Sequence, residues 1–153
     1  MRDCAVEVLE DVQGRADPRA IAIQQVGIRA VRHPMQVQDR DGAMQPSIAQ
    51  CNMYVSLPAH LKGTHMSRFI EILNTHEGPF SVEGFGAVVE EMRQRLEADS
   101  ARLEMRFPFF VQKAAPVSGV KSMLDYEVEL AGEITPAGYH LTIGVMVPVT
   151  SLC

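Results

Sequence analysis

The N-terminal third of the chain shows the alternation of apolar and polar residues that is typical of strands. Residues 21–37 form the first predicted strand, and a change of phase near Val26 indicates a β-bulge. Residues 49–57 form the second, with a mainly apolar face and a mainly polar face. Residues 39–42 supply the aspartates and the glycine of a tight turn. The two strands are therefore predicted to form a hairpin.

The middle of the chain has the 3.6-residue period of amphipathic helices. One apolar stripe predicts a helix near residues 66–76, with Met66, Phe69, Ile70 and Leu73 on the buried side. A second stripe predicts a helix near residues 82–98 that begins after Ser81, a residue type that caps helix N-termini. The members of this second stripe are Phe85, Val88, Val89, Met92 and Leu96. Both helices need an apolar surface to cover.

Alternation returns in the last third of the chain and predicts strands at residues 103–109, 124–130 and 141–149. Pro108 is expected to place the first of these at a sheet edge or a bulge. The order β-β-α-α-β-β predicts an α+β fold, an antiparallel sheet of four or five strands with two helices on one face. Residues 1–20, interrupted by Gly14 and Pro18, are predicted to be a flexible arm before a single domain at 21–153.

The composition suits one globular domain, since the 153 residues are 46% hydrophobic and 22% charged. No apolar stretch approaches the roughly 20 residues that span a bilayer, and the acidic N-terminus is unlike a signal peptide, so we expect a cytoplasmic protein with no membrane partner. The net charge of −5 argues against a nucleic-acid partner. The spacing of Cys4, Cys51 and Cys153 favours reduced thiols, with Cys51 as a small buried hydrophobe.

Several short motifs resemble one enzyme family in their order along the chain. The most specific is the block Lys62-Gly63-Thr64-His65-Met66-Ser67-Arg68-Phe69. The others are Asp11-Val12-Gln13, Val26-Gly27-Ile28, Leu57-Pro58-Ala59, Phe107-Pro108-Phe109-Phe110, Ala115-Pro116-Val117-Ser118-Gly119, Leu124-Asp125-Tyr126 and Val147-Pro148-Val149-Thr150-Ser151-Leu152-Cys153. Together they resemble GTP cyclohydrolase type IB over nearly the whole chain from about Asp11.

The resemblance implies a tunnelling fold, whose subunits join their sheets into barrels with active sites between subunits. It implies a homo-oligomer joined through sheet edges that converts GTP and water to 7,8-dihydroneopterin triphosphate and formate, the first step of folate-type biosynthesis. It also implies a divalent metal, which is zinc, manganese or iron, with Cys153 as its ligand and as a catalytic residue. A divalent metal can supply hydroxide by lowering the pKa of bound water.

In that family the chain continues beyond the matching cysteine into a second module that supplies further site residues. The resemblance therefore predicts that this chain is the first part of the enzyme, with doubtful activity alone. The alternative is a non-catalytic assembly module that oligomerises, or that pairs with a separate C-terminal half. Open sheet edges would favour such association because their unpaired N–H and C=O groups seek partners.

His65 and Arg68 are the first candidates for site residues outside the C-terminal cysteine. His65 lies between a glycine-containing turn and a helix start, where it could act as a catalytic residue or could cap and brace the helix. Arg68 follows on the same helix and could bind a triphosphate, or it could hold a carboxylate across a subunit interface.

Three further residues flank a loop between predicted strands: Lys113, Ser118 and Lys121. The N–H groups of this glycine-containing loop could form an anion-binding nest, with the two lysines adding positive charge. The alternative is an exposed hairpin loop with two solvated lysines. Lys113, Ser118 and Lys121 are therefore candidate ligands of the substrate's phosphates.

Overall fold

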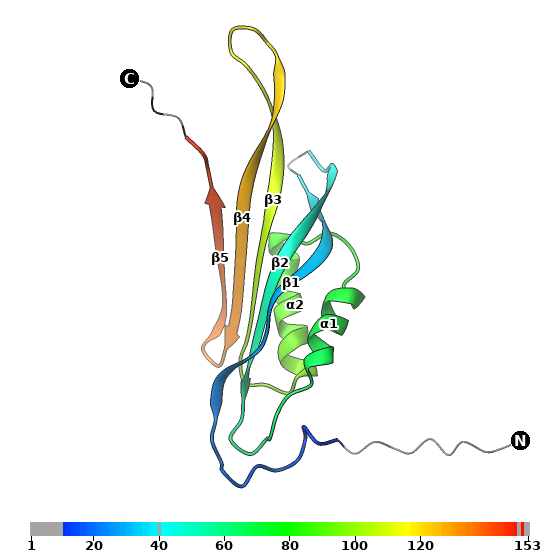
Figure 1. Ribbon diagram of the computed structural model, residues 1–153, viewed down its shortest axis with the longest axis vertical. Coiled ribbons are helices and arrows are strands. Elements are labelled where there is room, and N and C mark those ends of the chain that lie inside the picture. Colours follow the sequence, from blue (N-terminus) through cyan, green and yellow to red (C-terminus); the bar gives the residue numbers. More distant parts are fainter. Residues whose placement is uncertain (1–10, 40, 150, 152–153) are drawn as a thin grey trace, which may run out of the picture.

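The computed structural model describes residues 11–39, 41–149 and 151. Its elements are β1 (Ile23–Gln38), β2 (Met44–Leu57), α1 (Met66–Thr75), α2 (Val82–Arg95), β3 (Ala101–Ala114), β4 (Lys121–Thr135) and β5 (Gly138–Met146). The strands form one antiparallel sheet in the order β1-β2-β3-β4-β5, and both helices lie on one face of it (Figure 1). The predicted α+β fold is confirmed, with five strands in the described part of the chain.

The hydrophobic core lies between the helices and the middle of the sheet. Cys51, Met53 and Val55 alternate with polar residues on β2, and all three are buried under the helices. The predicted stripe of α2 is buried along its whole length, from Phe85 to Leu96. The Ser81 hydroxyl accepts a hydrogen bond from the Gly84 N–H at 3.0 Å, which confirms the predicted cap. Neither helix has the length and apolar character needed to cross a membrane, and these are the helices of the described residues.

The predicted stripe of α1 is partly wrong. Phe69 and Leu73 are buried as predicted, and Ile72 is buried with them. Met66 and Ile70 are 42% and 37% exposed. The reason is the position of α1, which packs against α2 and β1 and buries the side centred on Phe69, Ile72 and Leu73. The sequence shows the amphipathic period of α1, but it does not show on which side of the helix α2 and β1 lie.

Pro108 does not place its strand at a sheet edge, because β3 is the central strand. The register explains how a proline is tolerated there. The β2–β3 ladder runs from Val55 opposite Ala101 to Gln50 opposite Arg106, and Pro108 follows its last pair. A proline has no N–H to donate, and beyond this ladder β2 does not require one. The Ser47 hydroxyl instead donates to the Pro108 carbonyl at 2.8 Å.

Beyond that ladder, β3 and β4 continue together as a long hairpin. They remain paired to the turn, where Ala114 lies opposite Lys121. The β4–β5 ladder begins only at Glu127. The hairpin therefore projects past the rest of the sheet, as the yellow segment at the top of Figure 1 shows. Sequence alternation predicted only the inner parts of both strands.

Candidate active site

Residues 11–17 run alongside residues 60–63, in the loop that precedes α1. Backbone N–H groups join the two segments, with Gly63 donating to Gln13 O at 3.2 Å, Lys62 to Arg15 O at 3.0 Å and Asp17 to His60 O at 3.1 Å. A β-bridge also pairs Ala16 with Leu61. Residues 11–17 belong to the predicted arm, whose first ten residues lie outside the described part of the chain. The segment thus contacts the loop that carries His65.

His65 occupies the N-cap position of α1, with extended backbone angles. Its side chain makes no capping hydrogen bond. Instead, its Nε2 atom lies 3.2 Å from Oδ1 of Asp11. The His65 side chain therefore does not cap α1, the alternative that it braces the helix stays a prediction, and the imidazole lies against a carboxylate of the N-terminal segment.

Asp11 is held by its own backbone as well as by His65. Its Oδ1 accepts hydrogen bonds from the N–H groups of Gln13 at 3.1 Å and Gly14 at 3.0 Å. The bond from Gly14 lowers the pKa of Asp11, desolvation opposes it, and the charge of His65 adds to the lowering. Asp11 is consequently a carboxylate near neutral pH and can only accept hydrogen bonds.

Arg68 makes contacts within its own chain. Its guanidinium donates to the Arg95 carbonyl at 3.0 Å and lies 4.0 Å from a carboxylate oxygen of Glu97. The Arg95 carbonyl belongs to the last turn of α2, where carbonyl groups lack helical partners. Arg68 therefore joins the start of α1 to the end of α2, a structural use that the sequence did not predict.

The predicted phosphate-binding residues lie at the hairpin of β3 and β4. Lys113 donates to the Tyr126 hydroxyl at 2.5 Å and lies over the Tyr126 ring. Ser118 accepts from the Val120 N–H at 3.4 Å, and the Gly119 N–H donates to Ala115 O at 2.9 Å. These two loop N–H groups are bonded inside the turn. The charges of Lys113 and Lys121 and the hydroxyl proton of Ser118 remain available to an anion.

The candidate residues fall at opposite ends of the molecule. The hairpin with Lys113, Ser118 and Lys121 lies at the top of Figure 1, whereas the start of α1 lies in the lower half. Strand β5 begins at Gly138 and runs upward in Figure 1, so that Met146 is its end nearer the β3–β4 hairpin. Cys153 lies outside the residues that the structure describes. One copy of the described chain thus does not bring His65 and the hairpin lysines together.

The described residues do not form a metal site by themselves. No group of three or more histidine, cysteine, aspartate or glutamate side chains in residues 11–39, 41–149 and 151 could hold an ion. A catalytic zinc site normally takes three protein ligands. The expected metal therefore rests on Cys153, and we derive no chemical step through a metal from the described part.

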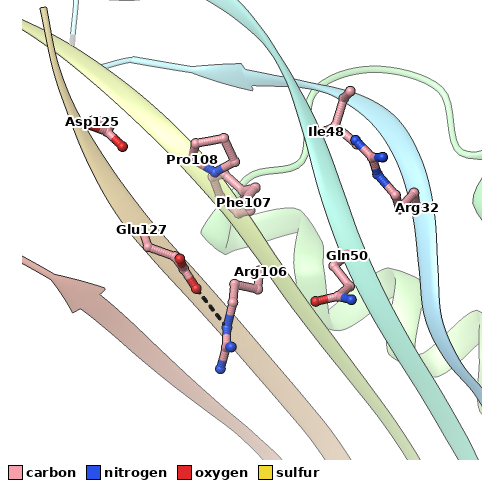
Figure 2. A pocket seen from close by; sticks show the side chains of 8 residues that line it. All are labelled: Arg32, Ile48, Gln50, Arg106, Phe107, Pro108, Asp125 and Glu127. Carbon is pink, nitrogen blue, oxygen red and sulfur yellow. Dashed lines mark ion pairs between the residues drawn. The ribbon is translucent and has the colours of Figure 1, made fainter.

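The helix-free face of the sheet carries a feature that sequence reasoning missed. An open hollow of about 460 Å³ lies across β1 to β4 (Figure 2). Arg106 pairs there with Glu127 at 3.1 Å and with Glu129 at 3.2 Å. The hollow is lined by Arg32, Ile48, Gln50, Arg106, Phe107, Pro108, Asp125 and Glu127. Its guanidinium groups can bind anions, and its carboxylate groups can bind cations or hydrogen-bond donors.

A second charged cluster lies further along the same face. Burial alone would raise the pKa of Glu104, but hydrogen bonds from Asn52 and Arg102 outweigh this effect and hold it below its usual value. The alternation of Arg102, Glu104 and Arg106 is visible in sequence. Their partners on β4 depend on strand register, which a single sequence does not specify.

Comparison with known proteins places the chain in an enzyme family. Residues 9–153 match the family described as "Type I GTP cyclohydrolase folE2". This match covers nearly the whole chain, including the His65 block and the C-terminal cysteine. The chain belongs to the GTP cyclohydrolase FolE2 family.

Individual relatives show the same similarity. The chain is 58% identical over 146 residues to GTP cyclohydrolase FolE2 of Nitrosomonas eutropha, covering 95% of this chain and 55% of that protein. It is 52% identical over 153 residues to the FolE2 of Methylobacillus flagellatus, covering 100% and 58%. The FolE2 of Azoarcus sp. is 53% identical over 154 residues, covering 100% and 57%. The chain therefore spans somewhat more than half the length of these relatives.

Proposed function

We propose that this protein acts as a cytoplasmic GTP cyclohydrolase of type IB, converting GTP and water to 7,8-dihydroneopterin triphosphate and formate. The observation that carries the proposal is the identity of 52–58% to proteins named GTP cyclohydrolase FolE2 over nearly all of this chain. The reaction would supply a folate-type pathway. A divalent metal, zinc, manganese or iron, would be held with the help of Cys153.

The proposed roles follow from the chemistry of each side chain. The imidazole of His65 can serve as a general acid or base, as opening and reclosing of a purine ring requires. Lys113 and Lys121 can attract the triphosphate, and Ser118 can donate a hydrogen bond to it. Arg68 can take part only with the part of its guanidinium that its bond to the Arg95 carbonyl leaves free.

We further propose that the complete site is built from more than one chain. The separation of the hairpin lysines from His65 within one copy supports this arrangement (Figure 1). A second copy, or a C-terminal module like that of the longer relatives, would have to bring the two groups together. The edge of β5 and the part of the β1 edge before the bridge between Val37 and Phe80 offer surfaces for such contacts.

Formate release from GTP tests the proposal. The chain is assayed alone with zinc or manganese, and also joined in frame to the part of the Nitrosomonas eutropha relative that it does not match. We expect the joined protein to release formate together with a neopterin product. Absence of formate from both proteins, when each is folded, would contradict the proposed activity.

A second candidate function is a non-catalytic assembly module. It is supported by the edge of β5, which has no neighbouring strand among the described residues, and by the 55% of the Nitrosomonas eutropha relative that the chain covers. The same assay separates the candidates. Formate release by the joined protein and none by the chain alone favours the module for the isolated chain, whereas release by the chain alone rules it out.

We expect the chain to form homo-oligomers through its sheet edges. Ile143, Val145 and Met146 are exposed apolar residues on edge strand β5. Light scattering during size exclusion should give a mass above the 16.9 kDa of one chain. Val145→Lys should shift the mass toward one chain, because lysine disfavours edge pairing. Val117→Lys, at the exposed hairpin tip, is the matched control. A wild-type monomer at high concentration would contradict the prediction.

A further inference from the structure

The contact between Asp11 and His65 joins two segments that are far apart in sequence. Oδ1 of Asp11 lies 3.2 Å from Nε2 of His65, with side-chain exposures of 58% and 32%. An ion pair this exposed contributes little to folding stability, because water and salt screen it. What the contact can affect is the orientation and the tautomer of the imidazole.

The carboxylate is itself held in place. The turn of residues 11–14 fixes Oδ1 through the N–H groups of Gln13 and Gly14. The backbone bonds of Gln13 to Gly63 and of Arg15 to Lys62 fix the segment against the loop. Asp11 thus presents a preformed acceptor to the ring of His65.

The ring of His65 can offer its Nε2–H group as the donor to that carboxylate. A neutral imidazole carries one N–H, and the opposite nitrogen keeps a free lone pair. A carboxylate at Nε2 favours the Nε2–H form and leaves Nδ1 unprotonated. In enzymes, a carboxylate bonded to one ring nitrogen fixes the tautomer and the ring orientation for the work of the other.

We propose that Asp11 is a positioning residue for His65, holding the Nε2–H tautomer so that Nδ1 faces the substrate as the proton acceptor. The catalytic consequence rests on the proposed function. The effect on the tautomer concerns only this chain's own residues and can be measured without activity.

Two other charged groups near His65 have partners of their own. Asp17 pairs with Arg19 at 2.7 Å, and the Arg68 guanidinium bonds to the Arg95 carbonyl. The remaining titratable or charged residues on the two docked segments are Arg15, His60 and Lys62. Asp11 is the residue to change because its Oδ1 lies 3.2 Å from Nε2 of His65.

Two variants of Asp11 weaken its contact with His65 to different extents. Asp11→Asn keeps an oxygen for the turn and can still accept the Nε2–H, but without charge. Asp11→Ser keeps a hydroxyl that can replace the turn bonds, and that hydroxyl is too short to reach the imidazole. The matched control is Asp17→Ser, on the same segment but paired with Arg19 rather than with His65.

The first measurement is the nitrogen-15 chemical shift of both ring nitrogens of His65, recorded where the imidazole is neutral and assigned with His65→Gln. We expect wild type and Asp17→Ser to show Nε2 protonated and Nδ1 unprotonated. Both signals should move toward the average of exchanging tautomers in Asp11→Ser and by less in Asp11→Asn. Unchanged signals in Asp11→Ser, or a wild-type ring protonated at Nδ1, would overturn the proposal.

The second measurement is the kinetics of formate release by the active preparation, which is the chain alone or the joined protein, whichever releases formate. We expect Asp11→Ser to lower kcat by about 10- to 100-fold, the range seen when the outer partner of a metal-bound histidine is removed. KM for GTP should stay within about twofold, since the interaction acts on the chemical step. An unchanged kcat, or a rise in KM alone, would overturn the positioning role. If neither the chain alone nor the joined protein releases formate, the proposed function fails, and the ring nitrogens still decide the tautomer.

Discussion

Cys153→Ala is expected to abolish formate release from GTP by the active preparation. The thiolate of a cysteine is both a zinc ligand and a nucleophile, and alanine can replace it in neither role. Removing even an outer partner of a metal ligand costs about 10- to 100-fold, so loss of a ligand should cost more than about 100-fold. The comparison is made at equal protein concentration and with the same added metal.

Cys51→Ala is the matched control for this loss. Cys51 is fully buried, and burial raises the pKa of its thiol to about 11, so it carries no thiolate at neutral pH. We expect Cys51→Ala to lower stability while folded molecules keep their rate of formate release. A rate in Cys153→Ala equal to that of wild type would show that the thiol is not required. Equal losses in both variants would trace the effect to folding.

The core of the fold was predictable because its signals are local and strong. The stripe from Phe85 to Leu96 repeats over several turns, and Ser81 marks where it begins. The alternation around Cys51 likewise assigns one face of β2 to the core. Each pattern survives because the whole element packs against one surface.

The errors arose where neighbours, not local pattern, decide the outcome. Met66 and Ile70 fit the helical period, but α1 turns them away from α2 and β1. Pro108 suggested an edge strand, yet it is accommodated in the central strand because the ladder with β2 ends before it. A single sequence does not specify where the pairing of two strands ends or which side of a helix faces its neighbours.

The candidate site divides in the same way. His65 could be singled out because its glycine-containing turn and the helix start are adjacent in sequence. Its partner Asp11 could not, since that contact depends on how residues 11–17 dock against residues 60–63. The only signal was indirect: both residues belong to motifs that resemble the same family. Neither motif by itself predicts the pair.

Gly27 occupies the tightest backbone approach among the described glycines. It lies opposite Tyr54, with a register shift on either side in the β1–β2 ladder. A Cβ added there would overlap the carbonyl oxygen of Met53 and lie 2.8 Å from its carbonyl carbon. It would also lie 2.9 Å from the Cα of Tyr54. The obstacle is the backbone of an adjacent strand, which cannot rotate away as a side chain can.

Gly27→Ala is accordingly expected to lower the free energy of unfolding by about 3 kcal/mol, the upper end of the usual cost of overpacking. Gly144→Ala is the matched control, because its added Cβ would meet its nearest atom, Cβ of Glu129, at an ordinary 3.6 Å. That change should be neutral or stabilise by up to about 1 kcal/mol, through the lower entropy of the unfolded chain. Urea unfolding at matched protein concentration measures both, with equal slopes required for comparison. Similar midpoints for the two variants would mean that β1 can move away from β2 at little cost, and that the close approach at Gly27 does not hold the hairpin together.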